Sequence, residues 1–148
     1  MDKWVAVLVT VFAGSLVAMQ APINSALGKS VGTFAAASLS FAIGLTVLIG
    51  ITLVAGSGGF SNLGEAGDLK WYYLTGGVLG AIYVTSVLVS VRTLGAGGVT
   101  AATIAGQLTM SVVLDRSGVL GLDERALTPQ RLAGILLLAA GTFLIVRE

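Results

Sequence analysis

The sequence predicts an all-α integral membrane protein, because it has too little charge for a soluble domain and because its apolar residues form long runs. Of its 148 residues, 55% are hydrophobic and only 10% are charged, whereas soluble domains carry about 25% charged residues. A chain of this size has a large surface for its volume, and its few charges cannot cover that surface in water. We therefore expect the surplus apolar surface to face lipid.

Five apolar runs lie between the charged residues, close to the length of about 20 residues that a helix needs to cross a bilayer. They cover residues 4–27, 33–55, 71–91, 99–114 and 132–146. We expect one membrane domain, residues 1–148, made of two helical hairpins and a fifth helix. Thr128 and Pro129 mark the beginning of the last helix, as its N-cap and its first helical residue.

The connections between these runs are predicted to be of two kinds. Residues 56–70 and 115–131 are expected to form solvated loops, and residues 29–32 and 92–98 tight turns. Five spans place the two termini on opposite sides, so Lys and Arg can be counted by side. One side carries Lys3, Lys70, Arg116, Arg125 and Arg131, and the other carries Lys29, Arg92 and Arg147. The side with more positive charge is the expected cytoplasmic one, but so weak a bias also permits insertion in both orientations.

The composition excludes several classes of function. The net charge is +1, which gives no electrostatic reason for nucleic-acid binding. The chain contains neither cysteine nor histidine, so disulfides, thiol nucleophiles, imidazole bases and Cys/His zinc sites are ruled out. Because no nucleophile–base pair is visible either, we expect no enzyme activity, no cofactor and no metal.

Small residues recur along the predicted helices at a spacing that favours close helix packing. Helices associate in lipid through small side chains that let their backbones approach each other. The residues of this pattern are Gly32, Ala36, Ser40, Gly44, Gly76 and Gly80. Packing is the expected role, and helix faces that slide during a conformational change are the alternative.

Two groups of polar residues within the predicted spans are candidates for a binding site. Gln20 and Asn24 lie one turn apart on the first span, and Pro22 between them is expected to bend the helix. They either line a substrate path or make a structural hydrogen bond to another helix. On the fourth span, Gln107 and Ser111 belong to a polar stripe that is expected to face a cavity or another polar helix.

Tyr83 adds a third candidate near the middle of the third span, where its ring could stack on a ligand or its hydroxyl could bind one. It could equally be a core residue. No Asp, Glu, Lys or Arg occupies the middle of a predicted span. Asp115, at the end of the fourth span, is the one candidate for a coupling carboxylate, and the preferred alternative is a solvated charge beside Arg116.

An ordered set of short motifs extends over nearly the whole chain: QAPINSALG at 20–28, GGVLGAIY at 76–83, Leu94-Gly95, AGQLTMS at 105–111, DRSG at 115–118 and RLAG at 131–134. These segments resemble motifs of the YdcZ family, a five-span branch of the drug/metabolite transporter superfamily. The resemblance implies a half-size transporter in the bacterial inner membrane. It also implies that two copies can pair antiparallel as a homodimer, giving a ten-helix assembly like that of larger relatives.

The resemblance and the residues together favour a transporter of an unidentified small organic molecule, working by alternating access in the antiparallel dimer. Its path would be lined by Gln20, Asn24, Tyr83, Gln107 and Ser111. Small multidrug exporters of the superfamily use a membrane-embedded Glu in the first helix, and this sequence has none there, so proton coupling is not supported. A small ion channel of dual topology and a non-transporting subunit that needs a partner are the alternatives. Conductance in a planar bilayer would distinguish the channel, and copurification of a stoichiometric partner would favour the subunit.

Overall fold

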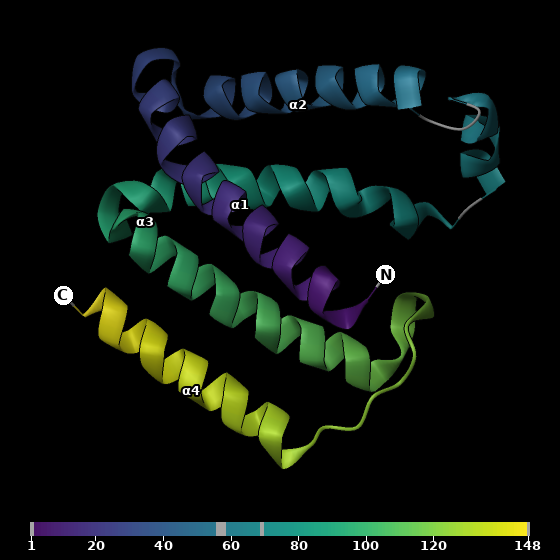
Figure 1. Ribbon diagram of the computed structural model, residues 1–148. Coiled ribbons are helices and arrows are strands. Elements are labelled where there is room, and N and C mark those ends of the chain that lie inside the picture. Colours follow the sequence, from purple (N-terminus) through teal and green to yellow (C-terminus); the bar gives the residue numbers. More distant parts are fainter. Residues whose placement is uncertain (1, 56–58, 69, 148) are drawn as a thin grey trace. The chain divides into compact units, whose positions relative to one another are not determined.

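The computed structural model describes residues 2–55, 59–68 and 70–147, and every regular element within these ranges is helical. The all-α prediction is therefore confirmed. Figure 1 labels the four α-helices along the chain. The elements are α1 (Lys3–Val31), α2 (Thr33–Ala55), η1 (Ser61–Asp68), η2 (Trp71–Thr75), α3 (Gly76–Ser117), η3 (Val119–Gly121) and α4 (Pro129–Val146), where η marks a 3-10 helix.

Four helical segments of the described residues are long and apolar enough to cross a membrane, where the sequence predicted five spans. They are Lys3–Val31, Thr33–Val54, Trp71–Ser117 and Pro129–Val146. The difference lies in residues 71–117, which were expected to form two spans joined by a tight turn at 92–98. Within this segment two helices meet at a kink at Gly95, which lies inside the predicted turn.

A single residue, Gly95, interrupts α3. Its φ of 66° and ψ of 172° lie outside the helical region, in a part of backbone space that is essentially restricted to glycine. Gly97 and Gly98 follow within the helix, and at Gly98 an added Cβ would lie 3.1 Å from Leu94 Cβ. The change of direction predicted for residues 92–98 is therefore placed at Gly95, and Gly97 and Gly98 already belong to the helical segment that follows it.

The chain divides into two compact units, residues 1–89 and 90–148, and each is described by itself. In the first unit, α1 and α2 are joined at Gly32, whose φ of 90° suits glycine. Small residues form much of the buried surface on these two helices, including Ala21, Gly28 and Ala36. Such residues let helix backbones approach closely in lipid.

The small residues that were predicted to pack lie in different surroundings within this unit. Ala36 is fully buried, and an added Cβ at Gly80 would lie 3.5 Å from Phe41 Cζ. An added Cβ at Gly44 or Gly76 would meet no atom within 4 Å. The sequence spacing alone therefore does not distinguish a contacting face from an open one.

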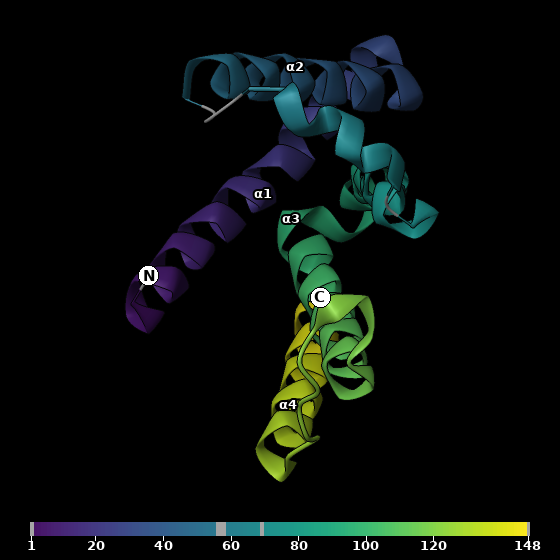
Figure 2. The same ribbon diagram turned by 90° about the vertical axis from the view of Figure 1, so that its right-hand side faces the viewer.

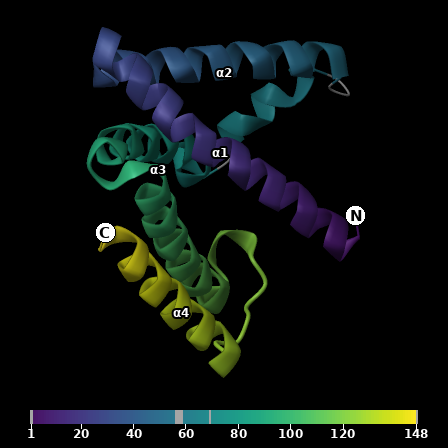
Figure 3. The ribbon, with the colours of Figure 1, turned by 60° about the vertical axis from the view of Figure 1, so that its left-hand side comes forward.

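The second unit contains the later part of α3 and all of α4, which lie side by side in each view (Figures 1, 2 and 3). The predicted beginning of α4 is confirmed. Thr128 Oγ1 accepts a hydrogen bond of 3.3 Å from the Arg131 N–H, and Pro129 is the first helical residue. Between the two helices, Thr142 Oγ1 donates to the Ala101 carbonyl at 3.0 Å.

The connection from α3 to α4 folds back onto the end of α3. The Arg125 N–H donates to the Asp115 carbonyl at 2.7 Å. Gly118 has a φ of 59°, and a Cβ there would come within 2.5 Å of Glu124 Cγ. Leu120 also has a positive φ, 61°, which is strained for a residue with a side chain. This predicted loop is therefore a packed connection that begins three residues later than expected.

The predicted loop at 56–70 contains the 3-10 helix η1, and the predicted third span begins with the 3-10 helix η2. Residues 56–58 and 69 of that prediction lie outside the described residues.

Large apolar side chains are exposed along all four α-helices, with Val54 90% exposed. Leu88 is the largest fully buried side chain in the part of the chain that the structure describes. An apolar surface of this extent requires lipid or protein as its neighbour.

Candidate functional site

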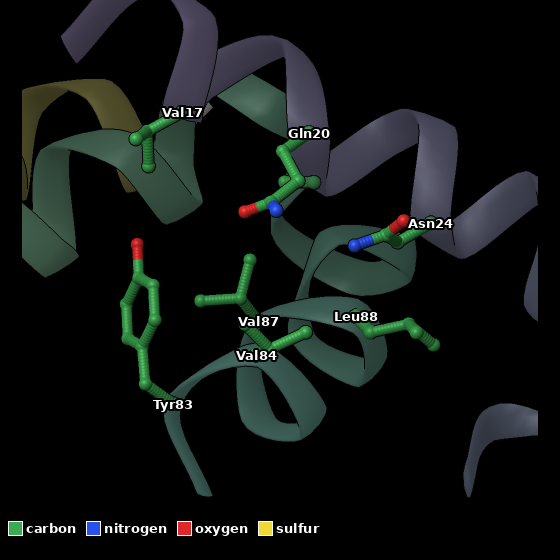
Figure 4. Close-up of a pocket in the computed structure, with 8 residues that line it drawn as sticks. Val17, Gln20, Asn24, Tyr83, Val84, Val87 and Leu88 are labelled. Carbon is green, nitrogen blue, oxygen red and sulfur yellow. The ribbon is translucent and has the colours of Figure 1, made fainter. Parts of the chain in front are cut away.

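Three of the predicted site residues, Gln20, Asn24 and Tyr83, line one pocket in the first unit. Figure 4 shows their polar groups around a shared space between α1 and the beginning of α3. The remaining wall residues are apolar. The pocket is lined by Val17, Gln20, Ala21, Asn24, Tyr83, Val84, Val87 and Leu88.

Helical spacing explains why these residues meet. On α1, the residues Val17, Gln20 and Asn24 follow one another at intervals of three and four, which places them on one face. Tyr83 and Val87 have the same relation on α3. Pro22 lies inside α1, which continues as one helix to Val31. Its missing N–H leaves the Ala18 carbonyl, one turn earlier, without its helical partner; the predicted bend stays a prediction.

Asn24 is the most deeply placed polar residue of the pocket. Its side chain is directed into the space in Figure 4, and the residue is only 6% exposed. Among the described residues, no side chain or backbone group is hydrogen-bonded to its amide. The amide lines the pocket instead of being enclosed by the protein. The Asn24 amide is therefore free to bind water or a ligand.

The pocket is small and carries no Asp, Glu, Lys or Arg in its walls. Its volume is about 10 Å³, which is close to the least that one water molecule needs. An isolated charge would be costly in such surroundings, whereas a neutral hydrogen-bonding group would be matched by the amides and the phenol. The site therefore suits the end of a small, neutral hydrogen-bonding group.

A second, larger hollow adjoins the same part of α1 and was not predicted. It has a volume of about 330 Å³, within the size range of small-molecule sites. Its lining residues are Gln20, Ser40, Phe41, Gly44, Leu45 and Leu48. Ser40 and Gly44 were expected to pack against another helix. A stripe of small residues on a helix can either pack closely against another helix or line a void. The spacing of these residues in the sequence therefore did not predict the groove.

Gln20 borders both hollows. Its side chain is exposed, unlike that of Asn24. The polar pocket and the apolar groove consequently share one hydrogen-bonding residue.

Gln107 and Ser111 belong to the second unit, so they are not part of the pocket that the other three predicted residues form. Both residues are exposed. The Ser111 hydroxyl donates to the Gln107 carbonyl at 2.7 Å, a bond within its own helix that satisfies the hydroxyl locally. Their predicted role in binding stays a prediction.

Asp115 forms an ion pair with Arg131, with 3.0 Å between Oδ2 and Nη2. Its partner is therefore Arg131 and not the neighbouring Arg116, because the folded connection brings the beginning of α4 to the end of α3. Each side chain of the pair is 29% exposed. Arg131 Nη1 is buried and has no partner among the described residues. A role of Asp115 in coupling stays a prediction.

The sequence did contain a signal for this pair. A cation in the first turn of a helix, such as Arg131 in α4, interacts unfavourably with the helix dipole, so a nearby acidic partner is favoured.

The described residues contain no cluster of three or more acidic residues that could hold a metal ion.

Comparison with known proteins gives one match. A family model described as "Putative inner membrane exporter, YdcZ" matches residues 5–144. No curated protein and no solved structure matches the chain. The matched region covers most of both units, α2 and α3 completely, α1 and α4 except at their outer ends, and every lining residue of the pocket.

Proposed function

The chain belongs to the YdcZ family of inner-membrane transport proteins, and from this premise we propose that it exports a small organic molecule by alternating access. The observation that carries the proposal is the pocket of Gln20, Asn24 and Tyr83. In an apolar helical protein, amides that line a pocket need water or a ligand as their hydrogen-bond partner. Neutral hydrogen bonds from these three residues would fix the orientation of the substrate.

The proposal includes five membrane spans. At 1.5 Å per residue, a continuous 47-residue helix would be about 70 Å long, more than twice the hydrocarbon thickness of about 30 Å. The break at Gly95 divides Trp71–Ser117 into segments that each match one crossing. Five crossings put the termini on opposite sides of the membrane.

An antiparallel homodimer completes the proposal. Transporters are commonly built from inverted repeats around a site near the bilayer midplane, and two oppositely inserted copies would supply such a repeat. The weak difference in positive charge between the two sides permits both orientations. We propose that the substrate path extends to Gln107 and Ser111, because these residues belong to a polar stripe on one face of their helix.

Export is tested by comparing culture media. Cells expressing the wild-type chain, Asn24→Ala or Ser15→Ala would be grown in parallel, and small molecules in the medium would be profiled by mass spectrometry. Ser15 lies on the same helix, and its hydroxyl already bonds the Val11 carbonyl at 3.1 Å, so its variant is the matched control. We expect at least one compound to accumulate outside wild-type and Ser15→Ala cells and to fall to the level of empty cells with Asn24→Ala. Identical media from all strains would contradict export.

The antiparallel arrangement has a separate test that uses the absence of cysteine. A single Cys would be added after Glu148 and labelled in intact cells with a membrane-impermeant maleimide, before and after permeabilisation. About half of the protein should label from outside if the two orientations are equally populated. Labelling from one side only would exclude the antiparallel homodimer.

A further inference from the structure

The polar pocket and the apolar groove meet at Gln20, and this juxtaposition specifies the kind of molecule that the site can take. The pocket has room for a group about as large as one water molecule, whereas the groove has a volume of about 330 Å³. A substrate of ordinary size fits the groove but not the pocket. Only its polar head can therefore reach Asn24.

The chemistry of the two walls differs in the same way. Asn24, which is 6% exposed, directs its amide into the pocket (Figure 4). An amide both donates and accepts hydrogen bonds, as does the Tyr83 hydroxyl. The groove is lined mainly by Phe41, Leu45 and Leu48, which offer apolar contact. No lining residue of either hollow is Asp, Glu, Lys or Arg.

The geometry points to an uncharged amphiphilic substrate, with a compact amide or hydroxyl head bound at Asn24 and Tyr83 and an apolar body in the groove. This inference rests on the export function proposed above and adds the substrate class. A cationic head would have no anionic partner in the walls and would lose its hydration there. The groove is occupied by the substrate itself. Gln20 borders both the groove and the pocket in which the Asn24 amide lies. A lipid acyl chain or an apolar helix face in the groove would offer these amides no hydrogen bond.

Two probes of nearly equal shape separate charge from size. The amide 4-phenylbutanamide and the amidine 4-phenylbutanamidine share one apolar body, and the amidine is a planar cation at neutral pH. Their binding to the purified full chain in lipid nanodiscs would be measured by equilibrium dialysis against empty nanodiscs. We expect the amide to bind at least tenfold more tightly, because one unmatched buried charge outweighs a hydrogen bond.

Variants then assign the two ends of the ligand. Asn24→Leu removes the amide at similar volume, and Tyr83→Phe removes only a hydroxyl and serves if the first variant does not fold. Either change should weaken binding of the amide about tenfold for one lost hydrogen bond. Gly44→Val fills the groove and should weaken binding by about the same factor or more, since an added Cβ at Gly44 meets open space. Gly50→Val, on the same helix and equally open at its Cβ, is the matched control and should change nothing.

Each alternative gives a different result. Equal or tighter binding of the amidine would overturn the uncharged head, and binding of neither probe would overturn the site. If a lipid chain or a second copy fills the groove, Asn24→Leu and Tyr83→Phe will leave amide binding unchanged, which also overturns the inference. The assay measures binding and not transport. If the chain binds the amide more tightly than the amidine but exports nothing, the proposed function is refuted and this inference stands.

Discussion

The two units of the chain place their polar groups differently. In the second unit, Asp115 binds Arg131 near one end of α4 and Thr142 donates to the Ala101 carbonyl nearer the other, and Arg131 Nη1 is buried without a partner among the described residues. In the first unit, the amides of Gln20 and Asn24 line a pocket. Paired groups fasten helices together, whereas a group that lines a pocket is available to water or a ligand. The comparison favours the first unit as the place of the proposed binding and predicts that the pairs of the second unit hold its two helices together.

We expect the largest change in stability from a substitution at Gly95, which interrupts α3 where its later part begins to pair with α4. Gly95→Ala would force a side chain into a backbone region that is essentially restricted to glycine, at a cost of about 1–3 kcal/mol. We expect the free energy of unfolding, measured by titrating detergent micelles with sodium dodecyl sulfate, to fall by about this amount. Gly97→Ala is the control, since that residue is helical and open at its Cβ. It should raise stability by about 0.5–1 kcal/mol. Equal effects of the two changes would mean that Gly95 carries no special constraint.

Asn24 provides the sharpest test of the difference between the units. Asn24→Leu replaces an amide that lines a pocket with an apolar side chain of similar volume, so stability should be kept or rise by up to about 1 kcal/mol. The same change should abolish export. The two readouts are the unfolding titration and the medium profile of the expressing cells. A loss of stability in this variant would show that the amide is satisfied in the folded protein, and the first unit would then resemble the second.

The ion pair of the second unit should contribute a measurable but smaller energy. Asp115→Asn, Arg131→Gln and the double variant form a cycle whose coupling energy isolates the pair. Because both side chains are partly exposed, we expect a coupling of about 1 kcal/mol. Unfolding titrations of the four proteins provide the values. Additive effects of the two single changes would mean that the pair does not hold α4 to α3.

The hydrogen bond from Thr142 is expected to have the smallest effect. Thr142→Val removes a bond between two helices, and such bonds contribute about 0.6 kcal/mol on average in membrane proteins. Thr109→Val is the control, because the Thr109 hydroxyl bonds the Ala105 carbonyl of its own helix at 2.8 Å. The difference in unfolding free energy between the two variants measures the contribution between helices. If the two variants have the same unfolding free energy, the Thr142 hydrogen bond does not stabilise the contact between α3 and α4, and only the ion pair distinguishes the second unit.

The sequence predicted the helices well where the local signals were unambiguous. Thr128 and Pro129 mark the beginning of α4, and α2 covers the predicted residues 33–55. The glycine-rich segment at 92–98 predicted a turn, and the structure has a kink between two helices at Gly95. Composition alone did not show which glycine leaves the helical region, because glycine is compatible with both a turn and a helix.

The site was predictable only in part. Helical spacing on α1 grouped Gln20 with Asn24, but their meeting with Tyr83 depends on packing between segments about 60 residues apart in the sequence. The pairing of Asp115 with Arg131 depends on a connection that adopts positive φ at Gly118 and Leu120, which the sequence does not reveal for leucine. The groove was missed because Ser40 and Gly44 show the same spacing whether they touch a helix or line a void.

The unequal lengths of the helices have a consequence for the membrane around them. At 1.5 Å per residue, the 18 residues of α4 extend about 27 Å and the 29 residues of α1 about 44 Å. A hydrocarbon layer of about 30 Å is slightly thick for α4 and much too thin for an upright α1. Such hydrophobic mismatch is relieved by helix tilt and by local thinning of the bilayer. Longer acyl chains in the surrounding lipid therefore reduce the hydrophobic mismatch of α1 and increase that of α4, and shorter chains have the opposite effect.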